Sequence, residues 1–207
     1  MPNTLYQNNL NTLLTSIAFS ASQTSYNSYA TGNDSSSPPD SAVYGLYQCR
    51  NDLSFSDCST CVQSAVGQLS LVCAQSYAAS LQLDGCYVRY SNENFLGKLD
   101  TSLAYRKCSA STTDDGEFFR RRDDVLGDLQ NGASFRVSSS GTVQGHAQCL
   151  GDLNSADCAS CLSQAVAQLK NACGSALAAD VFLAQCYARY WATGYYLHSS
   201  KGKKLTN

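Results

Sequence analysis

The chain has 207 residues and a formal net charge of −2, and only 14% of its side chains are charged. This weak charge, without a basic excess, argues against a nucleic-acid partner. No run of about 18 apolar residues occurs, so any membrane attachment is expected through a segment outside these residues. We also expect no signal peptide within them, because neither a basic start nor an apolar run precedes the first helix-like segment.

Cysteine usage is the strongest signal in the chain. Eleven cysteines are typical of a secreted protein that supplements small cores with disulfides in an oxidising compartment. Five of them recur at a constant offset of 100 residues, Cys49, Cys58, Cys61, Cys73 and Cys86 being followed by Cys149, Cys158, Cys161, Cys173 and Cys186. Two copies of one module are therefore present, and we expect two domains, 1–107 and 108–207.

The first copy begins with a helix-like pattern. Apolar residues at helical spacing start at Tyr6 and predict a helix that ends near Ser22. Residues 31–41 are small and polar and include two prolines, which predicts an exposed loop. Asn33 begins an Asn-Asp-Ser sequon in this loop and is a candidate glycosylation site.

Strands and a second helix follow in the first copy. Residues 43–49 are rich in β-forming side chains and predict a strand. Ser56 or Asp57 is then expected to cap a helix. Two more strand-like segments are predicted over 79–89 and 95–107, and they end the first domain.

The second copy repeats this order. Its predicted elements are a helix around Phe118–Leu129, a strand over 143–149, a helix from Asp157 through Cys173, and strand from Val181 to Tyr196. The first helix repeats at an offset of 112, whereas the cysteines repeat at 100. The first copy therefore has about twelve extra residues between helix and strand, which we assign to the loop at 31–41.

Cys108 has no counterpart at the cysteine offset. At the helix offset, its counterpart would lie a few residues before Met1. We therefore expect six cysteines in a complete module, with Cys108 belonging to the second domain and the sixth cysteine of the first module lying outside these residues.

These motifs resemble one plant family. The Cys-x8-Cys-x2-Cys spacing and the Cys-Tyr-x-Arg-Tyr motif at 86–90 and 186–190 are similar to the ginkbilobin-like, or stress-antifungal, cysteine-rich domain. Two such domains in tandem resemble the ectodomains of plasmodesmata-located proteins and of cysteine-rich receptor-like kinases, and residues 128–132 and 182–190 are most similar to the plasmodesmata-located group. The resemblance implies an α+β fold in which each domain packs two helices on an antiparallel β-sheet, stabilised by disulfides.

The resemblance also implies a disulfide pairing, which spacing alone does not select. Cys73 is left unpaired by it. The implied pairs are Cys49 with Cys58, Cys61 with Cys86, Cys108 with Cys173, Cys149 with Cys158, and Cys161 with Cys186.

Metal binding and catalysis are the rival interpretations. Cys58-x-x-Cys61 has a spacing that also suits zinc or a redox dithiol. Each copy lacks a second close Cys or His pair, and the resemblance gives both cysteines a partner, so we expect neither a metal nor a cofactor. The two histidines, His146 and His198, fall in no catalytic motif, so we expect no enzyme activity.

Two possible binding surfaces were considered, a run of arginines and a sugar site. The run Arg120–Arg122, followed by two aspartates, is typical of a solvated helix face, although a basic docking site has the same composition.

Some members of the resembled family bind mannose through an Asn, an Arg and an acidic residue. The positions of the last two hold Ser80 and Ser91 in the first copy and Asp180 and Trp191 in the second, and Ser109 stands where the Asn is sought, so that site is not preserved.

The leading hypothesis is a non-catalytic extracellular recognition ectodomain of the plasmodesmata-located type, which regulates cell-to-cell traffic or signalling. A soluble antifungal or defence lectin for a cell-wall or mannose-type glycan is one alternative, and the ectodomain of a cysteine-rich receptor-like kinase is another. We expect an extracellular protein or a cell-wall glycan as the partner. The expected location is the apoplastic face of the plasma membrane, at plasmodesmata.

Overall fold

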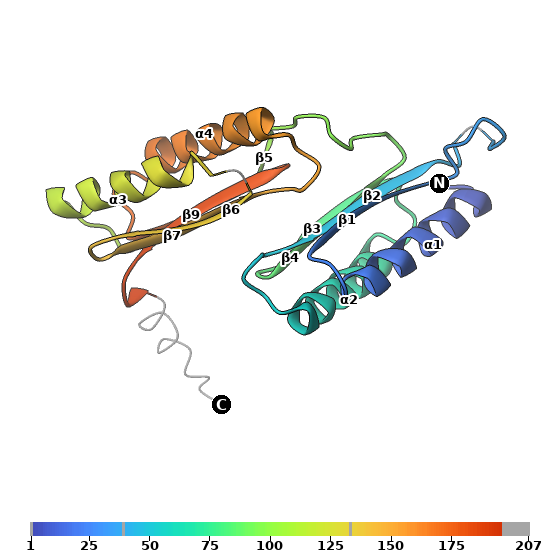
Figure 1. Ribbon diagram of the computed structural model, residues 1–207, viewed down its shortest axis with the longest axis horizontal. Helices are drawn as coiled ribbons and strands as arrows, with labels where there is room; N and C mark the ends of the chain where they lie inside the picture. The colour runs from blue at the N-terminus through green and yellow to red at the C-terminus, as the bar shows by residue number, and fades with distance from the viewer. Residues whose placement is uncertain (1, 39, 133, 196–207) are drawn as a thin grey trace. The chain divides into compact units, whose positions relative to one another are not determined.

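The computed structural model describes residues 2–38, 40–132 and 134–195. The chain divides into two compact units, Met1–Lys98 and Leu99–Asn207, which we call the first unit and the second unit. In each unit, two helices lie on one face of an antiparallel sheet (Figure 1). The predicted α+β class with two tandem domains is confirmed. None of the helices in the described ranges is long and apolar enough to cross a membrane.

The first unit has a four-stranded sheet in the order β1-β2-β4-β3. One stripe of each helix packs against it, which buries Tyr6, Leu13 and Ile17 of the first helix and Val62 and Leu69 of the second. The elements are α1 (Thr4–Ser20), β1 (Tyr26–Thr31), β2 (Val43–Cys49), α2 (Phe55–Val72), β3 (Ala78–Gln82) and β4 (Cys86–Ser91).

The second unit has a five-stranded sheet in the order β5-β8-β9-β7-β6. The strand β8 corresponds to β3 of the first unit, and β5 lies beyond it. The elements are β5 (Leu103–Cys108), α3 (Gly116–Leu129), β6 (Phe135–Ser140), β7 (Val143–Cys149), α4 (Ser155–Ala172), β8 (Ala178–Leu183) and β9 (Cys186–Ala192).

The starts of α2 and α4 lie earlier than predicted. The Ser54 hydroxyl accepts a hydrogen bond from the Asp57 amide at 3.1 Å and donates one to the Asp57 carboxylate at 2.7 Å. In α4 the Asn154 side chain accepts from the Asp157 amide at 2.9 Å. The predicted caps at Ser56, Asp57 and Asp157 are therefore wrong. The two aspartates lie in the first turn of their helices, and each exchanges hydrogen bonds with the cap residue three positions before it.

The sequence pattern does not predict β1 and β6. β1 contains Asn and Ser, which are poor β formers, and lacks a clear alternation of apolar residues. It pairs along its whole length with β2, from Tyr26 opposite Gln48 to Thr31 opposite Val43. β6 pairs with β7 in the same way. The neighbouring buried strand, rather than local propensity, therefore decides both elements.

The hairpins account for most of the length difference between the two copies. In the second unit, only Gly141 and Thr142 connect β6 to β7, and Gly141 has a φ of 54°, which a tight hairpin turn requires. In the first unit the corresponding connection spans residues 32–42, and Asn33 is exposed within it. α1 is also longer, with 17 residues against 14 in α3.

The division between the units lies ahead of the expected position at 107/108. The segment 95–107 does not complete the first sheet. Its last part forms β5, which pairs with β8 so that Cys108 lies opposite Ala179. The chain before β5 is held in the same unit, because the Gln185 side-chain oxygen accepts a hydrogen bond from the Asp100 amide at 2.6 Å. The strand's partner is thus set by the open edge of β8, not by its place in the sequence.

Candidate functional site

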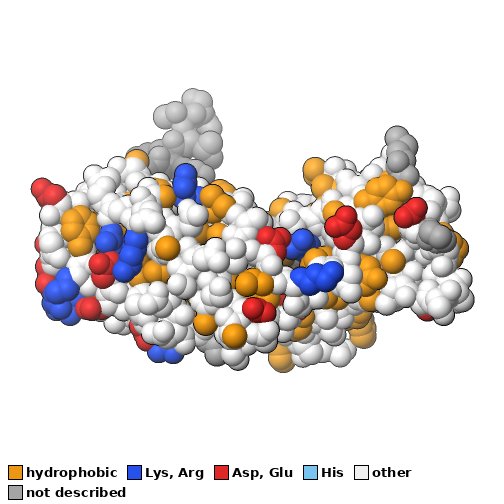
Figure 2. All heavy atoms as spheres, turned by 90° about the horizontal axis from the view of Figure 1, so that it is seen from above, with side chains coloured by type: hydrophobic (Ala, Val, Ile, Leu, Met, Phe, Trp, Pro, Cys, Tyr) orange, Lys and Arg blue, Asp and Glu red, His pale blue; other side chains and the backbone are white. Residues whose placement is uncertain are grey.

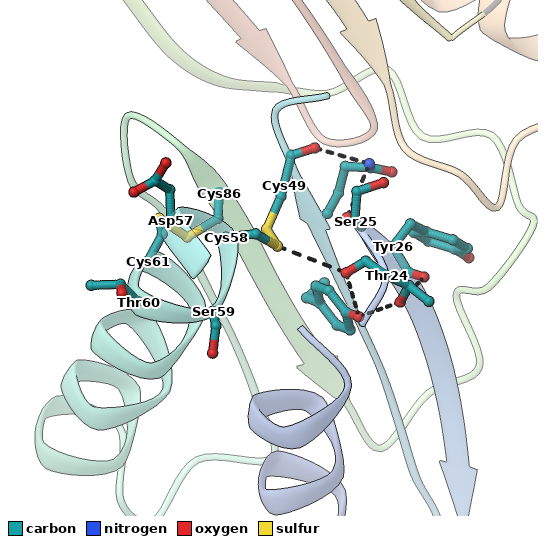
Figure 3. Close-up of a disulfide and its surroundings, with 12 residues drawn as sticks. Thr24, Ser25, Tyr26, Cys49, Asp57, Cys58, Ser59, Thr60, Cys61 and Cys86 are labelled. Carbon is teal, nitrogen blue, oxygen red and sulfur yellow. Dashed lines mark hydrogen bonds between the residues drawn. A yellow bond between two sulfur atoms is a disulfide. The ribbon is translucent and has the colours of Figure 1, made fainter. Parts of the chain in front are cut away.

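Two cystine bridges fasten the start of α2 to the sheet of the first unit. Cys49, at the end of β2, is bonded to Cys58 with Cα atoms 5.6 Å apart, and Cys61 is bonded to Cys86, at the start of β4, with Cα atoms 6.0 Å apart. Cys49 and Cys86 lie directly opposite each other in the ladder. Both bridges therefore clamp one point of the sheet to one helical turn (Figure 3).

The second unit repeats this clamp and adds a third bridge, from β5 to the end of α4. All Cα separations lie in the usual range for disulfides. The bridges are Cys149–Cys158 at 5.7 Å, Cys161–Cys186 at 6.1 Å and Cys108–Cys173 at 5.3 Å. Together with the two in the first unit, they form the pairing that the family resemblance implies.

The two cysteines weighed as a zinc or redox pair, Cys58 and Cys61, belong to separate bridges. Neither sulfur is a thiol. Within the described ranges, there is no group of three or more His, Cys, Asp or Glu residues that could hold a metal ion.

Cys73 and Cys173 occupy equivalent positions at the ends of α2 and α4, but only Cys73 is a free thiol. The Cys73 carbonyl accepts a hydrogen bond from the Tyr90 hydroxyl at 3.2 Å. The Tyr190 hydroxyl lies within hydrogen-bond distance of two carbonyls, those of Cys173 at 3.1 Å and Ala176 at 2.9 Å. Burial raises the pKa of Tyr90 to about 12, with a smaller contribution from Cys73. The last tyrosine of each Cys-Tyr-x-Arg-Tyr motif therefore anchors a helix end in the core.

The first tyrosine of that motif in the second unit lies on the other face of the sheet, in a row of rings. Tyr187 stacks on Phe182 with ring centroids 4.9 Å apart. The His146 ring meets Tyr187 and Trp191 edge-on, with centroids 5.5 Å and 5.6 Å apart, and its Nδ1 lies 3.2 Å from the Tyr187 hydroxyl. His146 is thus part of a packed ring cluster, which the sequence did not indicate. His198 lies outside the described residues.

The structure brings the three mannose-site positions of the second copy together near one end of three neighbouring strands, β5, β8 and β9. Ala178 lies opposite Trp191 and two residues before Asp180 on the same strand. The Ser109 amide donates a hydrogen bond to the Ala178 carbonyl at 2.8 Å. Chain topology therefore juxtaposes these positions although their residue types differ from the mannose-binding set.

Each of these side chains already has a protein partner. Asp180 forms an ion pair with Arg189, whose Nε lies 2.8 Å from the carboxylate oxygen. The Trp191 indole donates to the Gln144 side-chain oxygen at 3.2 Å, and the Ser109 hydroxyl donates to the Ser111 carbonyl at 2.6 Å. In the first unit, Ser80 is exposed in the middle of β3 and Ser91 ends β4.

The arginine run on α3 is a solvated face in two of its three residues. Glu117 accepts from Arg120 at 2.8 Å and from Arg121 at 2.7 Å, and hydrogen bonds from these two residues lower the pKa of the Glu117 carboxyl. Acidic and basic side chains are interspersed on a largely uncharged surface in Figure 2. Such exposed, paired charges do not form a basic docking patch.

Arg122 differs from its neighbours. Only 8% of it is exposed, its guanidinium donates to the Gly174 carbonyl, and it lies over the Phe119 ring with 5.1 Å to the centroid. It occupies the buried stripe of α3 with Phe118 and Val125. Helical spacing was the signal that could have identified it as a structural residue.

The comparisons with known proteins agree with this geometry. A family model described as salt stress response/antifungal matches residues 1–93 and 107–193. Plasmodesmata-located protein 8 of Arabidopsis thaliana is 57% identical over 202 residues, which cover 96% of this chain and 72% of that protein. Plasmodesmata-located protein 7 of the same plant is 45% identical over 207 residues, covering 100% of this chain and 68% of that protein.

Solved structures match both units together. The tandem DUF26 ectodomain of the Arabidopsis thaliana cysteine-rich receptor-like protein PDLP8 superposes with a TM-score of 0.88 at 56% identity, covering 94% of this chain and 93% of that one. The corresponding ectodomain of PDLP5 superposes with a TM-score of 0.86 at 42% identity, covering 94% of each chain.

Proposed function

Because this chain belongs to the salt stress response/antifungal (DUF26) family and has the tandem fold of plasmodesmata-located ectodomains, we propose that it is a non-catalytic extracellular recognition ectodomain that regulates cell-to-cell traffic or signalling. Its place is the apoplastic face of the plasma membrane, at plasmodesmata. Its partner is an extracellular protein or a cell-wall glycan.

The single observation that carries the proposal is the match of both units at once to the PDLP8 ectodomain, at 56% identity over 94% of this chain. The cystine clamps support an extracellular setting, because disulfides persist in oxidising compartments. The arrangement of His146 supports a non-catalytic role, since its ring is packed among other rings.

An ectodomain exchange tests the proposal. This chain replaces the ectodomain of Arabidopsis plasmodesmata-located protein 8, and a fluorescent tag reports where the chimera lies. Movement of a free fluorescent protein out of single transformed cells is then measured. We expect the chimera to accumulate at cell–cell junctions and to change that movement. The control is the same anchor without an ectodomain, and equal movement with both proteins would refute the proposal.

The second candidate, a soluble mannose-type lectin, is disfavoured by the partners of Asp180 and Trp191. A glycan array separates the two functions. Tight binding of mannose by this chain would reverse our ranking. The third candidate, the ectodomain of a cysteine-rich receptor-like kinase, shares this fold and would be distinguished by the sequence that continues the gene.

We further propose that Asn33 carries an N-linked glycan. It is exposed in the connection between β1 and β2, and N-linked sugars are carried on such surface segments. Expression in a plant secretory system should yield a protein whose mass falls after treatment with an amidase that removes N-glycans. The Asn33→Gln variant should show no such change, and an untreated mass equal to that of the bare polypeptide would rule out the modification.

A further inference from the structure

The strand β5 forms an exposed edge of the second unit and carries positive charge that has no acidic partner. We propose that this edge binds an acidic, extended segment of a partner protein, which adds a strand to the sheet and places carboxylates against Arg106 and Lys107. The proposal deepens the proposed recognition function and rests on it for its biological role. Its binding test involves no cell-to-cell movement, so either proposal can fail without the other.

β5 is the most exposed edge strand of the two sheets. The edges are β1 and β3 in the first unit and β5 and β6 in the second. Every residue of β5 is exposed, whereas β1, β3 and β6 each contain partly buried residues. On its inner side β5 is held by its ladder with β8 and by the bridge Cys108–Cys173. The strand therefore presents its outer side and both of its faces while it stays attached to the sheet.

The ladder with β8 leaves alternate backbone groups of β5 on the open side. The Ser109 amide donates a hydrogen bond to the Ala178 carbonyl at 2.8 Å. Because the direction alternates along an antiparallel strand, Lys107 also bonds to β8, whereas Arg106 and Cys108 direct their amides and carbonyls outward. Within the described residues, β8 is the single strand that pairs with β5. Main-chain groups at such an edge are the usual basis of strand addition.

The charge of this segment is available to a partner. Lys98, Arg106 and Lys107 are exposed, and none of them forms an ion pair within the described ranges. The solvated arginines of α3 and the arginine of β6, in contrast, are paired with carboxylates. Asp180 lies opposite Lys107 in the ladder, but its ion pair is with Arg189, whose Nε lies 2.8 Å away. The edge therefore complements an anionic ligand.

The same charges decide which strand fits the edge. If two copies of β5 paired antiparallel, with Arg106 opposite Cys108 of the other copy, Lys107 would face Lys107 of that copy. Like charges directly opposite each other destabilise a sheet, and opposite charges stabilise it. The cations thus reject a second copy and select an acidic strand. Tyr105, which is 49% exposed, lies on the same face as Lys107 and offers a contact to an apolar side chain.

The test uses the whole 207-residue chain and the fluorescent peptide Thr-Glu-Glu-Val-Thr-Val, blocked at both ends. In an antiparallel strand its glutamates lie opposite Lys107 and Arg106, and its first valine lies opposite Tyr105. Methylation of the second glutamate's amide nitrogen removes the donor that faces Arg106. Methylation of the first glutamate's amide nitrogen removes a donor that points away from β5. The two methylated peptides have the same composition and charge, so they are matched.

Fluorescence anisotropy at low ionic strength measures the affinities. We expect the parent peptide and the peptide methylated at the first glutamate to bind at least about fivefold more tightly than the peptide methylated at the second, because the latter leaves the Arg106 carbonyl without its donor. The peptide Thr-Lys-Lys-Val-Thr-Val should bind at least about tenfold more weakly than the parent peptide. Equal affinities of the two methylated peptides, or no saturable binding of the parent peptide, would overturn the proposal.

Neutralising the edge tests the charges from the protein side. The double variant Arg106→Gln, Lys107→Gln should bind the parent peptide at least about fivefold more weakly. The matched control, Arg120→Gln with Arg121→Gln, loses the same charge on α3 and should bind as the parent chain does. Circular dichroism and Trp191 fluorescence check the fold, and if the edge variant does not fold, the methylated peptides decide alone. Oligogalacturonate of equal charge is the competing ligand, and tighter binding of it than of the acidic peptide would refute the proposal.

Discussion

The two units share a cysteine frame, a pair of helices and a common sheet order, and they differ at one edge. The second unit carries β5 and the bridge Cys108–Cys173 beyond β8. In the first unit the corresponding strand β3 lies at the edge and Cys73 is free. Yet both units bury a helix–sheet core with fully enclosed residues such as Ile17 and Leu126. Within the described residues, the edge strand with its bridge is therefore a layer that the second unit adds to a core of the same kind.

The largest effect should come from removing the disulfide of that layer from the second unit. The double variant Cys108→Ser, Cys173→Ala opens a loop with a sequence separation of 65 residues, and we expect a loss of about 4 kcal/mol in the unfolding free energy of that unit, because the unfolded chain regains entropy. Trp191, the chain's one tryptophan, reports unfolding of the second unit by fluorescence. The first unit is the internal control, and equal stability of the variant and parent second units would show that the Cys108–Cys173 bridge does not stabilise the unit.

Adding the layer to the first unit should have the opposite sign and a somewhat smaller size. Asn3 and Asp115 are equivalent helix caps, so a copy of residues 103–114 is placed directly before Asn3. We expect a bridge to Cys73 that raises the unfolding free energy of the first unit by up to about 4 kcal/mol, with no thiol left to titrate. The same insert with serine in place of its cysteine separates the strand from the bridge. A thiol that stays titratable in the cysteine insert would contradict the equivalence of the two edges.

A smaller difference should distinguish the two core tyrosines. Tyr190→Phe removes a buried hydroxyl whose single proton lies within reach of two carbonyls, those of Cys173 and Ala176, whereas Tyr90→Phe removes a part-buried hydrogen bond to the Cys73 carbonyl. We expect roughly 1–2 kcal/mol of destabilisation for the second unit and roughly half as much for the first. Denaturant titrations of both variants measure this. A larger loss for Tyr90→Phe would mean that the helix end in the first unit depends more on that hydroxyl.

Alkaline pH should give the smallest difference in stability between the two units. Burial raises the pKa of Tyr90 to about 12, and it also raises the pKa of Tyr6, whereas in the second unit Arg122 opposes the rise that burial produces at Tyr190. A raised folded-state pKa gives stability that is full below the unfolded value of about 10 and is lost as the pH rises through the folded value, because the unfolded chain ionises first. We therefore expect the first unit to lose stability more steeply above about pH 10. Tyr90→Phe should make the first unit lose stability less steeply with pH. An unchanged pH dependence would mean that another group causes the loss.

Much of the architecture was predictable because it rests on local periodicity. The stripe beginning at Tyr6 predicts α1, and the doubled cysteine frame predicts two modules. The predicted caps were two or three residues too late. Serine, asparagine and aspartate are all common N-cap residues, and the aspartate that hydrogen-bonds to each true cap lies three positions after it. The ring cluster at His146 was not predictable, since its members come from β7, β8 and β9 and meet through register alone.

The amino-acid sequence by itself determined the duplication, the cysteine-rich class and the faces on which the helices are buried, because each of these depends on spacing along the chain. The tertiary structure alone decided that β1 and β6 are strands and that β5 belongs to the second unit. Strand pairing depends on which sheet edge is open elsewhere in the fold, and the residue pattern of one segment does not show which edge that is.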